Sequence, residues 1–194
     1  MLTSNALRSL VLTLVVATGL MSFPMKFAAA APAAGSLIKR TDHPAIYYYA
    51  SNGKRYVFPN ERTFKTWYAD FSSVQTITAA EMAAIPIGGN ATYRPGFKMI
   101  KIDTDPKVYT ISKGGMLRPI ASESAAASIY GSGWATLVDD IPDAFFVNYA
   151  MGAAISTSSD YNRDAELASA TNINADKGLT SISTPTPPPP PPPP

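Results

Sequence analysis

An internal duplication in the central part of the chain is the feature that most constrains its fold. When Leu37-Ile38-Lys39 is laid over Met99-Ile100-Lys101, an offset of 62 residues, similar residue types continue to recur at matching positions. Self-similarity at a fixed spacing marks repeated supersecondary units. We therefore assign residues 36–97 to a first repeat and 98–153 to a second. The matched pairs are Pro44/Pro106, Ile46/Val108, Tyr47/Tyr109, Gly53/Gly115, Phe58/Ile120, Glu61/Glu123 and Tyr68/Tyr130, followed, with two single-residue insertions, by Phe71/Trp134, Val74/Leu137, Ile77/Ile141, Ile87/Met151 and Gly88/Gly152.

Each repeat predicts a β-hairpin. In the first repeat, residues 45–50 and 54–58 are rich in aromatic and β-branched side chains, and Asn52-Gly53 between them favours a two-residue turn. The second repeat has residues 107–112 and 116–120 on either side of Gly114-Gly115.

Two short helices are expected after each hairpin. Asn60 and Ser122 predict N-caps for helices that end near Ala69 and Gly131. Thr78, with Glu81 three residues later, predicts a capping box, and Pro142 occupies the first position of the corresponding helix in the second repeat. The predicted fold class is α+β, with two tandem hairpin/helix repeats forming one small domain.

The predicted turn also suggests a candidate ligand or partner face. A two-residue loop would pair Tyr49 with Tyr56, and Tyr47 with Phe58, so that these four side chains share one face of the hairpin. The opposite face would also be largely apolar, so the hairpin needs cover on both sides. We expect the helices of the repeat to cover one face only. The other face would then meet the second repeat, another protein or a ligand.

Residues 1–30 have the pattern of a secretory signal peptide. A polar start with Arg8 precedes an apolar run over residues 10–23, which is too short to span a bilayer, and small residues follow. We expect cleavage after Ala30, with Ala34 as the second choice and an uncleaved anchor as the alternative interpretation. Cleavage would leave equal numbers of basic and acidic residues and no membrane span. The remaining chain is then expected to be secreted or at the cell surface, without electrostatic attraction to nucleic acid.

Residues 154–194 are predicted to be a disordered Ser/Thr/Pro-rich linker or stalk. From Ser156 onward large apolar residues are sparse, so ordering this stretch would not be offset by burial. The proline run 187–194 predicts an extended polyproline II rod. Such a rod could separate the repeats from a further domain, form a terminal stalk, or serve as a ligand for another protein.

Several kinds of chemistry are unsupported by the sequence. There is no cysteine, and the single histidine, His43, lies in a polar loop, so neither a thiolate site nor a Ser–His–Asp set is expected. The spacing of Asp160, Asn162 and Asp164 matches a calcium loop, but Ala165 replaces the turn glycine. Grouped carboxylates, which a glycosidase could use, occur at Asp103/Asp105 and Asp139/Asp140/Asp143. Their positions at turns and at a helix start favour structural roles. We therefore expect no enzyme activity, no metal and no cofactor.

Four stretches of the first repeat are distinctive: Tyr47-Tyr48-Tyr49, Gly53-Lys54-Arg55-Tyr56-Val57-Phe58-Pro59-Asn60, Trp67-Tyr68 with Phe71, and Ile85-Pro86-Ile87-Gly88-Gly89. Together they resemble uncharacterised secreted hairpin-plus-helix tandem-repeat proteins of candidate-phylum bacteria. The resemblance covers roughly 36–153 and is looser in the second repeat, where Arg118-Pro119-Ile120 replaces the aromatic strand. It implies secretion and a non-catalytic role, and it assigns no catalytic or binding residues.

Two functions follow as expectations. The first is a non-catalytic extracellular or cell-surface module that presents or spaces another domain through the Pro-rich linker. The second is a module that binds cell-wall or surface glycan through Tyr47, Tyr49, Tyr56 and Phe58, because aromatic rings stack on the apolar faces of sugars. The expected partners are therefore a glycan or another surface domain.

Overall fold

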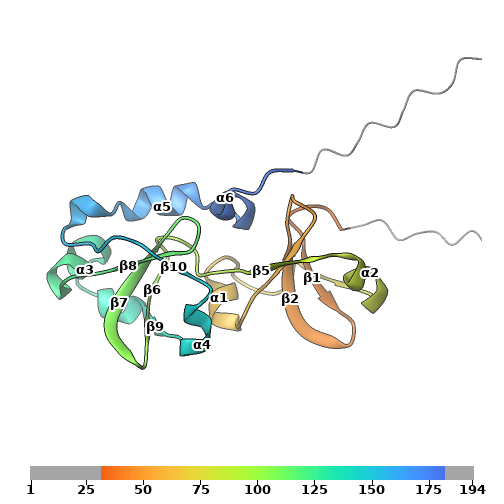
Figure 1. Cartoon of the computed structure of the whole chain (residues 1–194), viewed down its shortest axis with the longest axis horizontal. Helices are drawn as coiled ribbons and strands as arrows, with labels where there is room; N and C mark the ends of the chain where they lie inside the picture. Colours follow the sequence, from red (N-terminus) through yellow and green to blue (C-terminus); the bar gives the residue numbers. More distant parts are fainter. Residues whose placement is uncertain (1–31, 182–194) are drawn as a thin grey trace, which may run out of the picture. The chain divides into compact units, whose positions relative to one another are not determined.

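A computed structural model describes residues 32–181, and it contains short helices around two five-stranded mixed sheets (Figure 1). The predicted α+β class is confirmed. The strand order is β4-β1-β2-β3-β5 in the first sheet and, in the same sense, β9-β6-β7-β8-β10 in the second. The two repeats are therefore built alike. The first comprises β1 (Leu37–Arg40), β2 (His43–Tyr49), β3 (Arg55–Val57), α1 (Glu61–Lys65), β4 (Val74–Ile77), α2 (Ala79–Ala84) and β5 (Ile87–Asn90). The second comprises β6 (Met99–Ile102), β7 (Asp105–Ser112), β8 (Met116–Pro119), α3 (Glu123–Tyr130), η1 (Trp134–Leu137), β9 (Val138–Asp140), α4 (Asp143–Phe146) and β10 (Ala150–Met151).

The outer strands of both sheets are additions to the predicted elements. The centre of each sheet consists of three antiparallel strands. In the first sheet β4 pairs in parallel with β1, and β5 with β3. In the second sheet β9 pairs in parallel with β6, and β10 with β8. Leu37 pairs with Val74 and its counterpart Met99 pairs with Val138. Val74 is thus equivalent to Val138, and the predicted match with Leu137 is wrong by one residue. The four expected helices do form, although α1 stops at Lys65, short of the predicted Ala69.

The hairpin loops are one residue longer than predicted. The β2–β3 ladder pairs Tyr48 with Tyr56 and Tyr49 with Arg55. The Gly53 N–H donates to the Ala50 carbonyl at 3.0 Å, and Gly53 has φ of 72°. This is a three-residue loop that closes with a glycine in the left-handed region. The second hairpin has the same register, and Gly115 with φ of 70° is in the position of Gly53.

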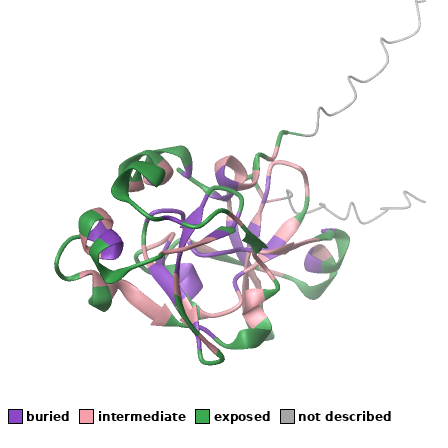
Figure 2. Ribbon diagram, turned by 60° about the vertical axis from the view of Figure 1, so that its left-hand side comes forward, coloured by how far each residue is buried: buried purple, intermediate pink, exposed green. Residues whose placement is uncertain are grey.

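The longer loop shifts β3 by one residue relative to β2, so that Tyr56 shares a face of the first hairpin with Tyr48 and no longer with Tyr47 and Tyr49. Tyr48 and Tyr56 face α1, where they pack with Phe64 in a buried cluster. Tyr47 and Tyr49 face α2 and pack around Met82. The two helices of the repeat therefore cover opposite faces of the sheet, and the expectation that they cover one face is wrong. Figure 2 shows buried residues in the central strands and on parts of the helices, with exposed residues in the outer loops.

The second sheet is covered in the same way. Tyr109 and Ile111, which match Tyr47 and Tyr49, pack with Phe145 and Phe146 of α4. On the opposite face Thr110 replaces Tyr48, which removes an aromatic ring from that core. Tyr161, from beyond the second repeat, packs beside Tyr130 there and donates its hydroxyl to the Ile111 carbonyl at 2.8 Å.

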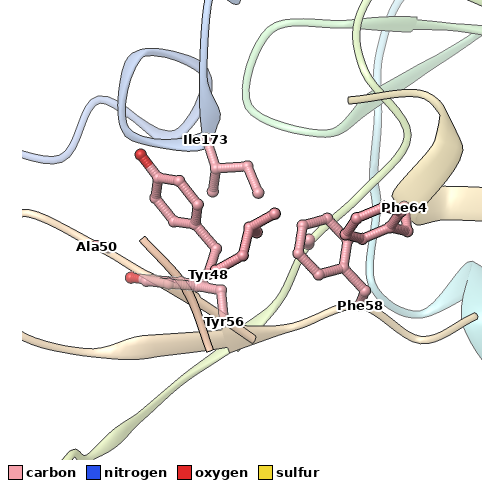
Figure 3. Packing of buried hydrophobic residues seen from close by; sticks show 8 residues of the cluster. Tyr48, Ala50, Tyr56, Phe58, Phe64 and Ile173 are labelled. Atoms are coloured by element: carbon pink, nitrogen blue, oxygen red, sulfur yellow. The ribbon is translucent and has the colours of Figure 1, made fainter. Parts of the chain in front are cut away.

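Residues 154–181 are part of the fold, so the predicted linker does not begin at residue 154. This segment forms η2 (Ser158–Asp160), α5 (Arg163–Ser169) and α6 (Ile173–Lys177). Ile173 is fully buried in the first-repeat core beside Tyr48, as Figure 3 shows. Asn162 and Asn172 cap the two helices through their side chains, so a few well-placed apolar residues and two caps order a largely polar sequence.

The predicted signal peptide and the proline run lie outside the described residues. Across residues 32–181, none of the helices is long and apolar enough to cross a membrane.

Gly88→Ala tests the closeness of the β3–β5 contact. A Cβ at Gly88 would lie 2.5 Å from the ring of buried Tyr56, so the substitution is expected to destabilise the protein by about 1–3 kcal/mol through overpacking. Gly133→Ala is the control, because Gly133 has φ of −86° and open space around its Cα. Urea denaturation measures both. Equal stability of the two variants would contradict the packing at Gly88.

Asp176→Asn tests a buried carboxyl group. Asp176 is 2% exposed, and its Oδ1 accepts from the Gly114 N–H at 2.8 Å, while Oδ2 has no hydrogen-bond partner in the described residues. Burial raises its pKa above the ordinary 3.8. Because the pKa is higher in the folded state, protonated Asp176 adds fully to the free energy of unfolding below the ordinary pKa of 3.8. This contribution is lost as pH rises through the higher pKa of the folded state. We expect Asp176→Asn to gain stability relative to the parent between pH 4 and pH 7 in urea denaturation. A difference that stays constant with pH would contradict this.

Candidate functional site

The four residues of the predicted ligand face do not lie together. Tyr56 and Phe58 are 6% and 7% exposed in the cluster against α1, whereas Tyr47 and Tyr49 are partly buried on the α2 side. The Arg55 guanidinium lies over the Tyr47 ring, 5.2 Å from its centroid. The predicted face is therefore wrong, because the three-residue loop assigns its members to opposite sides of the sheet.

A groove is present elsewhere in the first repeat, between the start of β2, the turn into α1 and the loop that follows α1. We call it the first groove. It has a volume of about 500 Å³, and of the predicted face only Phe58 lines it. Its wall and floor are mainly apolar. The lining includes Pro44, Ile46, Phe58, Asn60, Phe64 and Phe71.

The second repeat has a groove at the equivalent place, with a volume of about 320 Å³. We call it the second groove. Its lining residues correspond one by one to those of the first groove: Pro106, Val108, Ile120, Ser122, Ala126 and Trp134. Both sets of six follow the repeat alignment, including the matched rim residues Phe71 and Trp134. The duplication has therefore produced the same concave surface twice.

Local sequence explains why each groove stays open. The β2–β3 ladder begins at Tyr47, so the first residues of β2 extend past β3 and form a wall. Pro44 and Pro106 have no N–H to donate to an added strand. Asn60 then turns the chain into α1, with its side-chain oxygen accepting from the Thr63 N–H at 2.8 Å, and Ser122 caps α3 in the same way.

An aromatic ring stands at the rim of each groove. Phe71 is 42% exposed, and it stacks on buried Phe64 with ring centroids 4.5 Å apart. The Lys65 ammonium lies 4.9 Å from the centroid of the same ring. In the second repeat Ala126 replaces Phe64, and the larger Trp134 takes the position of Phe71. Aromatic surface is thus kept at the rim although the supporting residue differs.

Polar groups accompany each ring. Glu61 and Glu123 are exposed in the first turns of α1 and α3 and line the two grooves. His43 lines the first groove, with its Nδ1 accepting from the Ala45 N–H at 3.1 Å. Lys107 lines the second groove in the position of Ala45. Each groove therefore combines an aromatic platform with a carboxylate and carries little net charge.

A larger cavity of about 680 Å³ lies between the repeats and shares Asn60 and Glu61 with the first groove. Its two aspartates, Asp139 and Asp140, already have partners. Asp139 forms an ion pair with Lys98 at 2.8 Å and accepts from the Tyr93 hydroxyl at 3.1 Å. Burial, and then the nearby Asp139, raise the pKa of Tyr93, so the phenol remains a hydrogen-bond donor.

Of the other carboxylates considered for catalysis, Asp103 is exposed, whereas Asp105, Asp140 and Asp143 are engaged in hydrogen bonds or ion pairs. Asp105 accepts from the Tyr109 hydroxyl at 2.7 Å, which holds the pKa of Asp105 below its ordinary value. Burial, with Asp105 second, raises the pKa of Tyr109 to about 12. Asp140 pairs with Lys101, and Asp143 accepts from the Thr104 hydroxyl. Asp160 and Asn162, from the calcium-like spacing, direct oxygens to backbone N–H groups.

The paired grooves could have been found from the sequence. Phe71 and Trp134 are matched in the repeat alignment, and an aromatic residue kept at the same position after the first helix of both repeats is a signal for a shared surface. Comparisons with protein-family models, with curated proteins and with solved structures found no match for this chain.

Proposed function

We propose that this protein is a non-catalytic extracytoplasmic module that binds a cell-wall or surface glycan through the first and second grooves. The observation that carries the proposal is the position-by-position correspondence of the two grooves, each with an aromatic residue at its rim: Phe71, which is 42% exposed, and Trp134, which is partly buried. A concave apolar surface with a few polar groups is the usual form of a ligand site.

The chemistry of the lining suits a sugar ring. A pyranose has an apolar C–H face, which can lie on Phe71 or Trp134, and hydroxyl edges that donate hydrogen bonds to a carboxylate. Glu61 and Glu123 supply such a carboxylate on the helix beside each rim. The near balance of charge in both grooves favours a polymer of low charge density over a dense polyanion such as nucleic acid.

Alanine substitutions at the rims test the proposal. Phe71→Ala and Trp134→Ala should each weaken binding to peptide-free peptidoglycan glycan strands or to a neutral β-glucan, and the double variant should abolish it, because stacking area is lost. Met151→Ala, which removes an even more exposed apolar side chain on β10, should bind like the parent. Isothermal titration calorimetry measures affinity, and circular dichroism checks folding. Failure of the folded parent to bind either polysaccharide, or full binding by the double variant, would refute the proposal.

The presentation of another domain is a second candidate function, and one contact favours it. The Ser51 hydroxyl donates to the Leu179 carbonyl at 3.2 Å, next to the first hairpin loop. The chain therefore departs toward its proline run from a fixed point on the domain. A polyproline rod attached there would hold a partner at a defined distance.

The spacer role predicts a stiff rod in the proline run. Because the chain has no cysteine, spin labels can be attached at Ser181→Cys and Pro194→Cys alone. A polyproline rod places them about 40 Å apart, whereas a flexible coil gives about 20 Å. Double electron–electron resonance measures this separation, and a distribution centred near the coil value would contradict the spacer role.

A further inference from the structure

We infer that the ligand is a repeating linear polymer that occupies both grooves of one molecule at once, and that α5 and α6 form a clamp that fixes the spacing of the grooves. This inference rests on the proposed glycan-binding function. It goes beyond it by assigning two-site binding to a single chain and a role to the C-terminal helices.

The two hairpin tips are held by the same segment of chain. The Ser51 N–H donates to Asn174 Oδ1 on α6 at 3.0 Å. Lys113, which is equivalent to Ser51 at the offset of 62, donates its N–H to Glu166 Oε2 on α5 at 2.9 Å. The corresponding backbone donor of each hairpin loop is thus accepted by a side chain of the clamp.

Helix α6 by itself forms hydrogen bonds with both hairpin loops. Asn174 bonds the first hairpin, and Asp176, two residues later, accepts from the Gly114 N–H of the second hairpin at 2.8 Å. Ile173 is buried in the core of the first repeat beside them. In Figure 1, α5 and α6 lie along the ends of the sheets at which β2 and β7 finish.

This arrangement places the two grooves at the same end of their sheets. Each groove lies at the start of its strand, at Pro44 in β2 and Pro106 in β7, whereas the clamp holds the far ends of these strands. Both grooves are therefore on the end of their sheet away from the clamp. One extended ligand can meet the two grooves without passing the C-terminal helices.

The segment between the repeats is also held from several sides. Trp67 of the first repeat donates its indole N–H to the Thr92 carbonyl at 2.8 Å. The Arg94 guanidinium donates to the carbonyls of Leu167 and Ala170, which ties the segment to α5 and its end. Arg62 of α1 reaches the Asp140 carbonyl of β9 at 2.9 Å. The two repeats are therefore joined by hydrogen bonds as well as by the chain that connects them.

A fixed spacing between the two grooves allows one polymer to bind both, with a higher affinity than either groove has alone. Once a polymer occupies the first groove, its next units meet the second groove at a high effective concentration, and overall affinity rises by roughly 10²-fold or more. A loosened clamp lowers that effective concentration but leaves each groove unchanged. Because the two grooves are built from corresponding residues, the polymer must present the same apolar ring face twice.

The test compares long and short ligands. The full chain is titrated with peptide-free peptidoglycan glycan strands and a neutral β-glucan, and with the tetrasaccharide of each, by calorimetry. We expect two tetrasaccharides per molecule, and about 10²-fold tighter binding of the polymer. Phe71→Ala or Trp134→Ala should reduce the tetrasaccharide stoichiometry to one and remove the polymer advantage. Tetrasaccharide binding without a polymer advantage would overturn the two-site inference and leave the proposed function standing, whereas no binding of any ligand would refute the proposed function itself.

The clamp is tested with the double variant Glu166→Ala/Asn174→Ala. It should keep two tetrasaccharide sites of parental affinity and lose about tenfold in polymer affinity. Asp164→Ala, an exposed residue on α5, is the control. Spin labels at Ser73→Cys and Ala135→Cys, beside the two rims, should give a narrow distance distribution in the parent and a broad one in the clamp variant. A clamp variant that remains folded, with unchanged polymer affinity and an unchanged distribution, would overturn the clamp.

Discussion

The length of the hairpin loop is the constraint on which the rest of this structure depends. Three residues, closed by Gly53 or Gly115 in the left-handed region, connect the central strands of each sheet. Because side chains alternate along a strand, this loop decides that Tyr48 and Tyr56 face α1 while Tyr47 and Tyr49 face α2. Both faces are apolar, and the sheet needs a helix on each side. The order of strands and helices in both repeats follows from that need.

Residues 154–181 contribute buried side chains to the hydrophobic cores of both repeats. In the first repeat Ile173 fills the core beside Tyr48, and in the second Tyr161 supplies the ring that Thr110 does not provide. The same segment accepts hydrogen bonds from backbone N–H groups of both hairpin loops. The bonds from Ser51 and Gly114 are partly buried, where an N–H left without an acceptor costs more than it does in water. Two units that diverged in sequence are in this way kept in one domain.

The grooves lie where the duplicated fold is least covered. At the start of β2 and β7 a proline prevents further strand pairing, and the capped helix turns away from the strand. This leaves a concavity beside a loop residue that is free to be aromatic. The duplicated unit thus carries an equivalent groove twice, and the proposed ligand, a polymer with its own repeat, would match this arrangement. The proposed glycan function uses this correspondence of symmetry between protein and ligand.

The sequence by itself determined the duplication, the presence of the hairpins, the helix caps at Asn60, Ser122 and Thr78, and the α+β class, because these are local signals or depend on spacing along the chain. It also held the matched rim residues Phe71 and Trp134. The tertiary structure decided the rest. The loop length could not be settled locally, since Asn-Gly is compatible with two-residue and three-residue loops, and only packing on both faces selects the register. The outer parallel strands, and the folding of residues 154–181 into helices, depend on contacts with residues far away in the sequence. Composition alone therefore predicts a linker where the chain forms α5 and α6.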